Sequence, residues 1–225
     1  SGAQSLAPLA TLSHLNSLSL AGNQISDVSP LAGLTALQFL DLSDNRIANV
    51  AALATLVNLT SLDLGGNTIS DLRPISSLPL LQQLSLPGNV PDTIAPLQFL
   101  TQLTELDLAR NELTSDDIGV LVGLSQLTLL DLSNNEIDDF SELANFGSEV
   151  EFKLAGNPAS TGGPTDFITF CVQLRDEPTQ TGATIRAMIE VTGQSTCSGA
   201  ATVLNSSNAL TITGKTLSEL GPLAT

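Results

Sequence analysis

The stretch at residues 12–34 reads LSHLNSLSLAGNQISDVSPLAGL, and nearly the same order of residue types returns in LTALQFLDLSDNRIANVAALATL at residues 34–56. Seven successive repeats open on a large apolar residue, at Leu12, Leu34, Leu56, Leu78, Leu100, Leu124 and Phe146. The step between openings is 22 residues, except for 24 residues between Leu100 and Leu124. A fixed period of this length predicts a solenoid, in which each repeat forms one coil and stacks on its neighbours.

Each repeat divides into a strand and a return path. Leu18 and Leu20 alternate with polar residues, which predicts a short strand with one buried face. An asparagine recurs where the chain leaves the strand, and its amide can satisfy backbone groups of neighbouring coils. This asparagine ladder consists of Asn23, Asn45, Asn67, Asn89, Asn111, Asn135 and Asn157. The three-residue spacing of Ile25, Val28 and Leu31 then favours a 3-10 or short helical return.

The pattern LxxLxxLxLxxNxIxxVxxLxxL of residues 12–34 resembles the 22-residue class of leucine-rich repeats found in bacterial internalin-like surface proteins, and the match extends to about Asn157. The resemblance implies an α/β solenoid, a right-handed leucine-rich-repeat superhelix with a parallel concave sheet, convex 3-10 or helical returns and a role in protein recognition. The sequence departs from the pattern at Pro91, at Glu149 and at two extra residues near Asp116 and Asp117. These departures mark local loops that differ, and they leave the array intact.

Three segments follow from the repeat pattern. Residues 1–157 form the array of seven repeats, and residues 158–205 lack the pattern. Phe167, Phe170, Cys171 and Leu174 fall at helical spacing, and a second helix is expected from about Thr184 to Val191, so residues 158–205 are predicted to form a small helical cap. Residues 206–225 resume the leucine-rich repeat, because Leu210, Ile212, Leu217, Leu220 and Leu223 match the spacing of the first repeat.

The resumed repeat leaves two interpretations open. The chain is a fragment of a longer array-cap-array protein, or it is a subunit whose open ends stack head to tail. In the second case the assembly interface consists of Leu210, Ile212, Leu217 and Leu220, because an unpaired terminal coil presents apolar side chains and a strand edge.

Both cysteines, Cys171 and Cys197, lie in the predicted cap. A disulfide between them would stabilise the cap by about 3 to 4 kcal/mol, and two buried free thiols are the alternative. The disulfide favours an extracellular or cell-surface location.

Composition and charge exclude several classes of function. The chain has 225 residues, 42% hydrophobic and 13% charged, which predicts a folded core. Its net charge of −16, from 23 acidic and 7 basic residues, would repel phosphates, so we expect no nucleic-acid partner. No stretch approaches the roughly 20 apolar residues of a membrane span, so no membrane insertion is expected.

The sequence contains no arrangement of residues typical of an enzyme. It has a single histidine, His14, and no glycine-rich phosphate loop. A zinc site is also disfavoured, because His14 lies far along the chain from both cysteines. We therefore expect no catalysis, no cofactor and no metal.

Strand geometry predicts two columns of outward side chains. The outer column is Ser17, Phe39, Ser61, Gln83, Glu105, Leu129 and Glu151, and the aspartate column is Ser19, Asp41, Asp63, Ser85, Asp107, Asp131 and Lys153. From these columns we select the partner-binding residues Ser17, Phe39, Asp41, Asp63, Gln83, Glu105, Asp107, Leu129, Asp131 and Glu151. Phe39 and Leu129 are candidate anchors, although isolated exposed apolar residues are common. The aspartates are either solvated repeat positions or groups that a basic partner or calcium neutralises.

Two functions remain open. The favoured one is an extracellular recognition or adhesion module that binds a protein or glycan through its acidic concave face. The alternative is a structural subunit that assembles head to tail. A recognition module should be monomeric, whereas an assembly subunit should grow with concentration.

Overall fold

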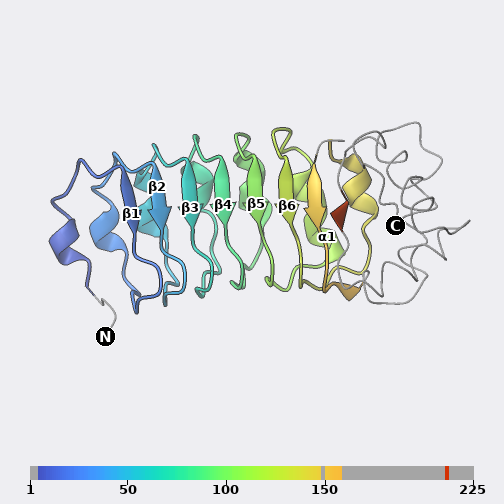
Figure 1. Ribbon diagram of the computed structural model, residues 1–225, viewed down its shortest axis with the longest axis horizontal. Helices are drawn as coiled ribbons and strands as arrows, with labels where there is room; N and C mark the ends of the chain where they lie inside the picture. Colours follow the sequence, from blue (N-terminus) through green and yellow to red (C-terminus); the bar gives the residue numbers. More distant parts are fainter. Residues whose placement is uncertain (1–4, 148–149, 159–210, 213–225) are drawn as a thin grey trace, which may run out of the picture. The chain divides into compact units, whose positions relative to one another are not determined.

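Each of the seven repeats forms one three-residue strand, as its alternating leucines predict. A computed structural model describes residues 5–147, 150–158 and 211–212 (Figure 1). The repeat strands are β1 (Ser17–Ser19), β2 (Phe39–Asp41), β3 (Ser61–Asp63), β4 (Gln83–Ser85), β5 (Glu105–Asp107), β6 (Leu129–Asp131) and β7 (Glu151–Lys153). In β2 to β7 the middle residue is buried and its two neighbours are more exposed, which gives every coil an inward and an outward side.

The return paths are short helical turns. They are η1 (Ala7–Leu9), η2 (Ser29–Leu31), η3 (Ala51–Thr55), η4 (Ile75–Ser77), η5 (Ala95–Phe99), α1 (Ser115–Ile118), η6 (Gly119–Leu121) and η7 (Ser141–Asn145). Particular residues stabilise the starts of several of these turns. Pro30 stands in the first turn of η2, where its fixed φ suits a helix. Asp27 accepts the Ser29 amide N–H at 2.8 Å, and Asp139 accepts that of Ser141 at 2.8 Å. These aspartates therefore satisfy the amides that open the returns.

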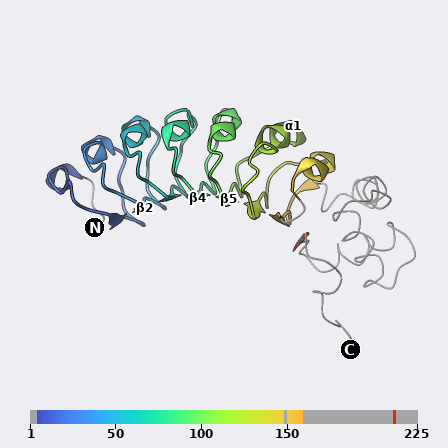
Figure 2. The ribbon, with the colours of Figure 1, turned by 90° about the horizontal axis from the view of Figure 1, so that it is seen from above.

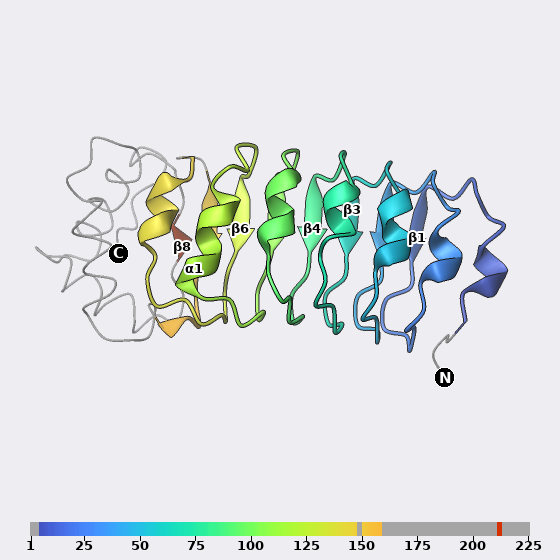
Figure 3. The same ribbon diagram turned by 180° about the vertical axis from the view of Figure 1, so that it is seen from behind.

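The chain divides into two compact units. The first unit comprises residues 1–111 and 123–127, and the second comprises residues 112–122 and 128–225. In the first unit β1 to β5 pair in parallel, each with the next, so that Leu18, Leu40, Leu62, Leu84 and Leu106 stand in register. The strands of this unit lie along one side and its helical turns along the other (Figure 2), and the turns stand nearer the viewer from behind (Figure 3).

Stacked aliphatic side chains fill the space between strands and returns. Leu40, Leu42, Ile47 and Leu53 of one coil are all 0% exposed. Burying such a side chain fully contributes about 1.5 to 3 kcal/mol, so each coil adds several of these increments. The first coil is less enclosed, and its Leu12 is 46% exposed.

The asparagine ladder joins neighbouring coils by hydrogen bonds. Asn67 is 6% exposed, and its Oδ1 accepts the Ile47 amide N–H at 2.9 Å. Its Nδ2 donates to the carbonyl oxygens of Leu42 at 3.0 Å and Leu64 at 2.9 Å. Asn45 repeats the same three bonds one coil earlier. The predicted role of the ladder is confirmed.

Pro91 changes one rung of the ladder. In regular coils the asparagine Oδ1 accepts the N–H of the residue two places after the previous asparagine, as Asn89 does from Ile69 at 3.0 Å. Pro91 occupies that place in the next coil and has no N–H. Asn111 Oδ1 instead accepts the N–H of Asn89 itself, at 3.0 Å. The departure from the repeat pattern is thus absorbed within a single coil.

The second unit contains β6 and β7 in parallel register, with Leu130 beside Phe152. The two extra residues of its first repeat allow a true α-helical turn, α1. Thr114 caps α1, because Asp117 Oδ2 accepts both the Thr114 amide N–H at 2.9 Å and its hydroxyl at 3.0 Å. Phe146 packs edge-on against Phe152 with ring centroids 5.4 Å apart.

β8 (Thr211–Ile212) pairs with β7 in the antiparallel direction, with Ile212 opposite Phe152. A strand was expected at this point, but repeat strands in an array run parallel, so its direction differs from that of a resumed repeat. The predicted cap from residue 159 onward lies outside the described residues, and so do Cys171, Cys197 and the assembly residues Leu210, Leu217 and Leu220.

The fold class is confirmed: seven parallel strands alternate with short helical returns around an aliphatic core. Among the described residues no helix combines the length and apolar character needed to cross a membrane.

Candidate functional site

The side chains of the outer column in the first unit are mostly exposed, and the described residues give them no polar partner. Phe39 is 39% exposed, Ser17, Gln83 and Glu105 are also exposed, and Ser61 is half-buried. Within the described part of the chain, none of these side chains makes a hydrogen bond or an ion pair. Because coil stacking does not use them, these side chains are available to a partner.

The aspartate column behaves differently, because its side chains turn back onto the protein. Asp41 Oδ1 accepts the Ser43 amide N–H at 3.0 Å and the Ser43 hydroxyl at 2.7 Å. Asp41 Oδ2 accepts the Ser19 hydroxyl of the neighbouring strand at 2.9 Å. Asp63 Oδ1 likewise accepts the Gly65 amide N–H at 2.9 Å and the Ser85 hydroxyl at 3.0 Å. Each carboxylate therefore fixes the turn that follows its strand.

The same bond recurs at the later aspartates. Asp107 Oδ1 accepts the Ala109 amide N–H at 2.9 Å, and Asp131 Oδ1 accepts that of Ser133 at 2.9 Å. These aspartates are half-buried and hydrogen-bonded to the turns, whereas the sequence favoured freely solvated side chains. The recurrence of an aspartate two places before the turn amide was the available signal.

Asp41 stays ionised in this setting. Burial, the largest single influence, raises its pKa, but the hydrogen bonds from the Ser43 side chain and backbone and from Ser19 together outweigh burial, so the pKa lies below its ordinary value of 3.8. The column therefore contributes negative charge to the strand surface as well as bracing the turns.

Charge is distributed unevenly between the two units. The outward strand positions of the first unit include the carboxylates of Asp41, Asp63, Glu105 and Asp107, and no lysine or arginine. In the second unit Lys153 lies beside Asp131 in register, with 3.6 Å between Nζ and Oδ2. The acidic character of the strands is therefore strongest in the first unit.

The anchor residues predicted from the sequence also differ. Phe39 is exposed, whereas Leu129 is half-buried. Phe39 stands in register between Ser17 and Ser61, so its ring rises beside two small side chains. Of the two candidate anchors, Phe39 is thus the more accessible.

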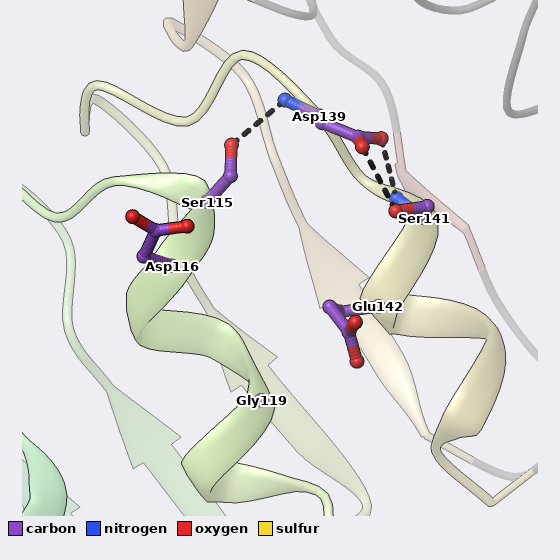
Figure 4. Close-up of a pocket in the computed structure, with 6 residues that line it drawn as sticks. All are labelled: Ser115, Asp116, Gly119, Asp139, Ser141 and Glu142. Atoms are coloured by element: carbon purple, nitrogen blue, oxygen red, sulfur yellow. Dashed lines mark hydrogen bonds between the residues drawn. The ribbon is translucent and has the colours of Figure 1, made fainter.

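A groove of about 280 Å³ lies between α1 and η7 of the second unit (Figure 4). Its lining is Ser115, Asp116, Gly119, Asp139, Ser141 and Glu142. Ser115 Oγ accepts the Asp139 amide N–H at 2.9 Å, and the Asp139 carboxylate accepts the Ser141 hydroxyl at 2.9 Å. The groove is polar, and three of its lining residues, Ser115, Asp139 and Ser141, already bond one another.

The described residues contain no group of three or more histidine, cysteine, aspartate or glutamate side chains placed to hold a metal ion. His14, the single histidine, is exposed in the first coil. Asp71 and Arg73 form an exposed ion pair of 2.9 Å, and the hydrogen bonds from Arg73 lower the pKa of Asp71 to about 2. That pair is a local turn contact rather than part of a site.

Three family models match the chain. A model of leucine-rich repeats in two copies matches residues 13–55, and two further leucine-rich-repeat models match residues 55–72 and 100–158. Leucine-rich-repeat domains typically serve as protein-interaction modules without enzymatic activity. Among curated protein sequences, none matches the chain.

Solved structures give the more specific likeness. An internalin (inlF) of Listeria monocytogenes is 35% identical with a TM-score of 0.57, over 67% of this chain and 51% of that one. Internalin C2 of the same bacterium is 36% identical with a TM-score of 0.65, over 70% of this chain and 69% of that one. The ectodomain of the Arabidopsis thaliana receptor kinase GASSHO1/SCHENGEN3 is 26% identical with a TM-score of 0.58, over 68% of this chain and 20% of that one. This chain thus spans about half of the first relative and about two thirds of the second. On these likenesses and its repeat geometry, the chain belongs to the leucine-rich-repeat family as a bacterial internalin-like member.

Proposed function

We propose that this chain is a recognition module that binds a protein partner on the outward face of its strands. The observation that carries the proposal is the outer column of the first unit, whose side chains are exposed and unused by the fold in the described residues. The asparagine ladder and the aspartate column of the same coils are, by contrast, occupied with internal hydrogen bonds.

The charge of this face favours a partner with complementary, positive groups. Opposite charges steer encounter and fix orientation, whereas they add less to affinity than a buried anchor does. Phe39 supplies the exposed aromatic side chain that such an interface needs at its centre. A protein offers both cations and apolar groups, which favours it over a glycan as the partner.

The location and class of the partner are also proposals. The plant receptor structure is an ectodomain in complex with Casparian strip integrity factor 2, so a related fold recognises a partner outside the cell. By analogy we place this chain in an extracellular or cell-surface setting, in an adhesive or recognition role. The predicted Cys171–Cys197 disulfide would accord with that setting.

Head-to-tail assembly through Leu210, Ile212, Leu217 and Leu220 stays a separate prediction. Light scattering distinguishes it from recognition, because a recognition module keeps a constant mass as its concentration rises.

Photo-crosslinking tests the proposed function directly. The photoreactive residue p-benzoylphenylalanine replaces Gln83 in the outer column or, as the matched control, the exposed Gln98 of η5. We expect a discrete crosslinked protein from position 83 that is lost when Phe39→Ser and Glu105→Arg are added, and none from position 98. Equal crosslinking from both positions, or a product unaffected by the added substitutions, would contradict recognition by the strand face.

A further inference from the structure

The acidic groups on the strand face of the first unit fall into two clusters with a neutral strand between them. Asp41 and Asp63 stand side by side on β2 and β3, and Glu105 and Asp107 stand on β5. The intervening strand β4 presents Gln83 and Ser85. Neighbouring strands lie about 4.8 Å apart, so Asp63 and Asp107 are separated by roughly 10 Å.

In each cluster a carboxylate oxygen remains available to a cation. Asp63 Oδ1 is occupied by Gly65 and Ser85, but Oδ2 accepts no hydrogen bond from the described residues. Glu105 is exposed, and both its oxygens are likewise without a partner in this part of the chain. Like charges on adjacent strands repel, so a cation beside Asp41 and Asp63 would also relieve that repulsion.

Phe39 adds a second attraction at the first cluster. It precedes Asp41 by two residues on the same strand, so both side chains leave the same face. Its exposed ring lies between Ser17 and Ser61, which leave room for a side chain to approach the ring face. A lysine or arginine placed there would contact the aromatic ring and a carboxylate together.

We infer that the strand face of the first unit recognises an extended segment carrying two cationic side chains about 10 Å apart, which is the spacing of β3 and β5. One cation would lie beside Phe39 and Asp63, and the other beside the β5 cluster, where Glu105 offers its exposed carboxylate. A polyproline II segment meets this requirement with cations at positions i and i+3, because it has three residues per turn and rises about 3.1 Å per residue. The inference rests on the proposed function and names the partner's chemistry.

Two synthetic peptides of equal composition test the spacing. The peptide PPKPPKPP carries its lysines at i and i+3, and PPPKKPPP carries them side by side. Titration of the isotope-labelled full chain, followed by amide chemical shifts, gives both the affinity and the place of binding. We expect the spaced peptide to bind about twofold to fivefold more tightly, because it engages one more exposed carboxylate. Its shifts should map to β2, β3 and β5.

Variants of the chain test which residue contacts each of the two cations. Glu105→Gln should abolish the preference for the spaced peptide, whereas the matched substitution Glu112→Gln, in an exposed loop, should preserve it. Phe39→Leu keeps an apolar side chain but removes the aromatic ring, and should weaken binding of both peptides about twofold.

Equal affinity for the two peptides, shifts mapped away from these strands, or no saturable binding up to millimolar peptide would overturn the inference. If position 83 still crosslinks a protein in that case, the proposed function stands and only the cationic spacing fails. If position 83 yields no product while the spaced peptide binds preferentially, the spacing holds and the protein partner is what fails.

Discussion

The asparagine ladder and the outer column run through the same coils, yet they differ in residue type, exposure and hydrogen bonding. The ladder repeats one residue type, and from Asn45 to Asn157 its members are at most 9% exposed. The outer column changes type from coil to coil, and in the first unit its side chains make no hydrogen bond to the rest of the described chain. A position that must serve every coil in the same way keeps its residue, whereas a position that the coils do not use is free to vary. The difference separates residues that hold the stack together from residues that can meet a partner.

The largest expected effect comes from removing a rung of the ladder. Asn67→Ala would leave the buried Ile47 amide without its acceptor. It would also remove one of the two asparagine donors to each of the Leu42 and Leu64 carbonyls, which keep Asn45 and Asn89. A buried amide left unsatisfied costs about 1 to 3 kcal/mol and each lost hydrogen bond about 0.5 to 1.5 kcal/mol, so we expect a loss of about 3 kcal/mol in the free energy of unfolding. Urea unfolding measures the loss. Asn23→Ala, in the half-buried first rung, is the control and should cost less.

Gly66→Ala should be the next most damaging change. Gly66 has φ +64°, and a Cβ there would also meet Asp44 Oδ1 of the preceding coil. Gly22 has φ +67° with nothing within 4 Å of its Cβ position, so Gly22→Ala isolates the conformational cost of about 1 to 2 kcal/mol. We expect Gly66→Ala to exceed Gly22→Ala in urea unfolding, and Asp44→Ala to recover part of the excess. Equal costs for the two glycines would show that the contact is harmless.

Substitutions in the two outward columns should differ in their cost to the free energy of unfolding, by less than the changes above. Asp63→Ala removes the acceptor of the Gly65 amide and the Ser85 hydroxyl, and should cost about 1 to 2 kcal/mol. Gln83→Ala, in the outer column, should stay within about 0.5 kcal/mol of the parent. The comparison is made by urea unfolding of both variants. A Gln83→Ala loss as large as that of Asp63→Ala would erase the distinction between the columns.

The smallest expected effect is a dependence on pH. Because the pKa of Asp41 is lower in the folded protein than its ordinary value of 3.8, its ionised form contributes stability above that value. The contribution is lost as pH falls through the folded pKa. Asp41→Asn should therefore lose less stability than the parent between about pH 5 and about pH 2.5. Parallel acid titrations monitored by circular dichroism would reveal identical curves if Asp41 has no such role.

The repeat period was sufficient to predict the strands, the returns and the role of the ladder, because each depends on residues that recur at fixed spacing. The outward columns followed from the same period. The recurring aspartate pointed to the bonds that Asp41 and Asp63 make with the next turn. Their bonds to Ser19 and Ser85 could not be predicted, because they depend on how each carboxylate meets the neighbouring strand once the coils stack. The replacement donor at Asn89 likewise depends on a contact between coils, and the antiparallel pairing of β8 with β7 was not predicted by the repeat spacing.

Recognition through the outer column is tested most directly by the crosslinking yield from position 83 in a variant that lacks the Phe39 ring and the Glu105 carboxylate. Phe39→Ser and Glu105→Ser together remove the anchor and the exposed carboxylate while leaving the ladder and the aspartate column intact. We expect the urea midpoint to stay close to that of the parent and the crosslinked partner to disappear. A folded double variant that still crosslinks the same partner at the parental yield would contradict recognition through the outer column.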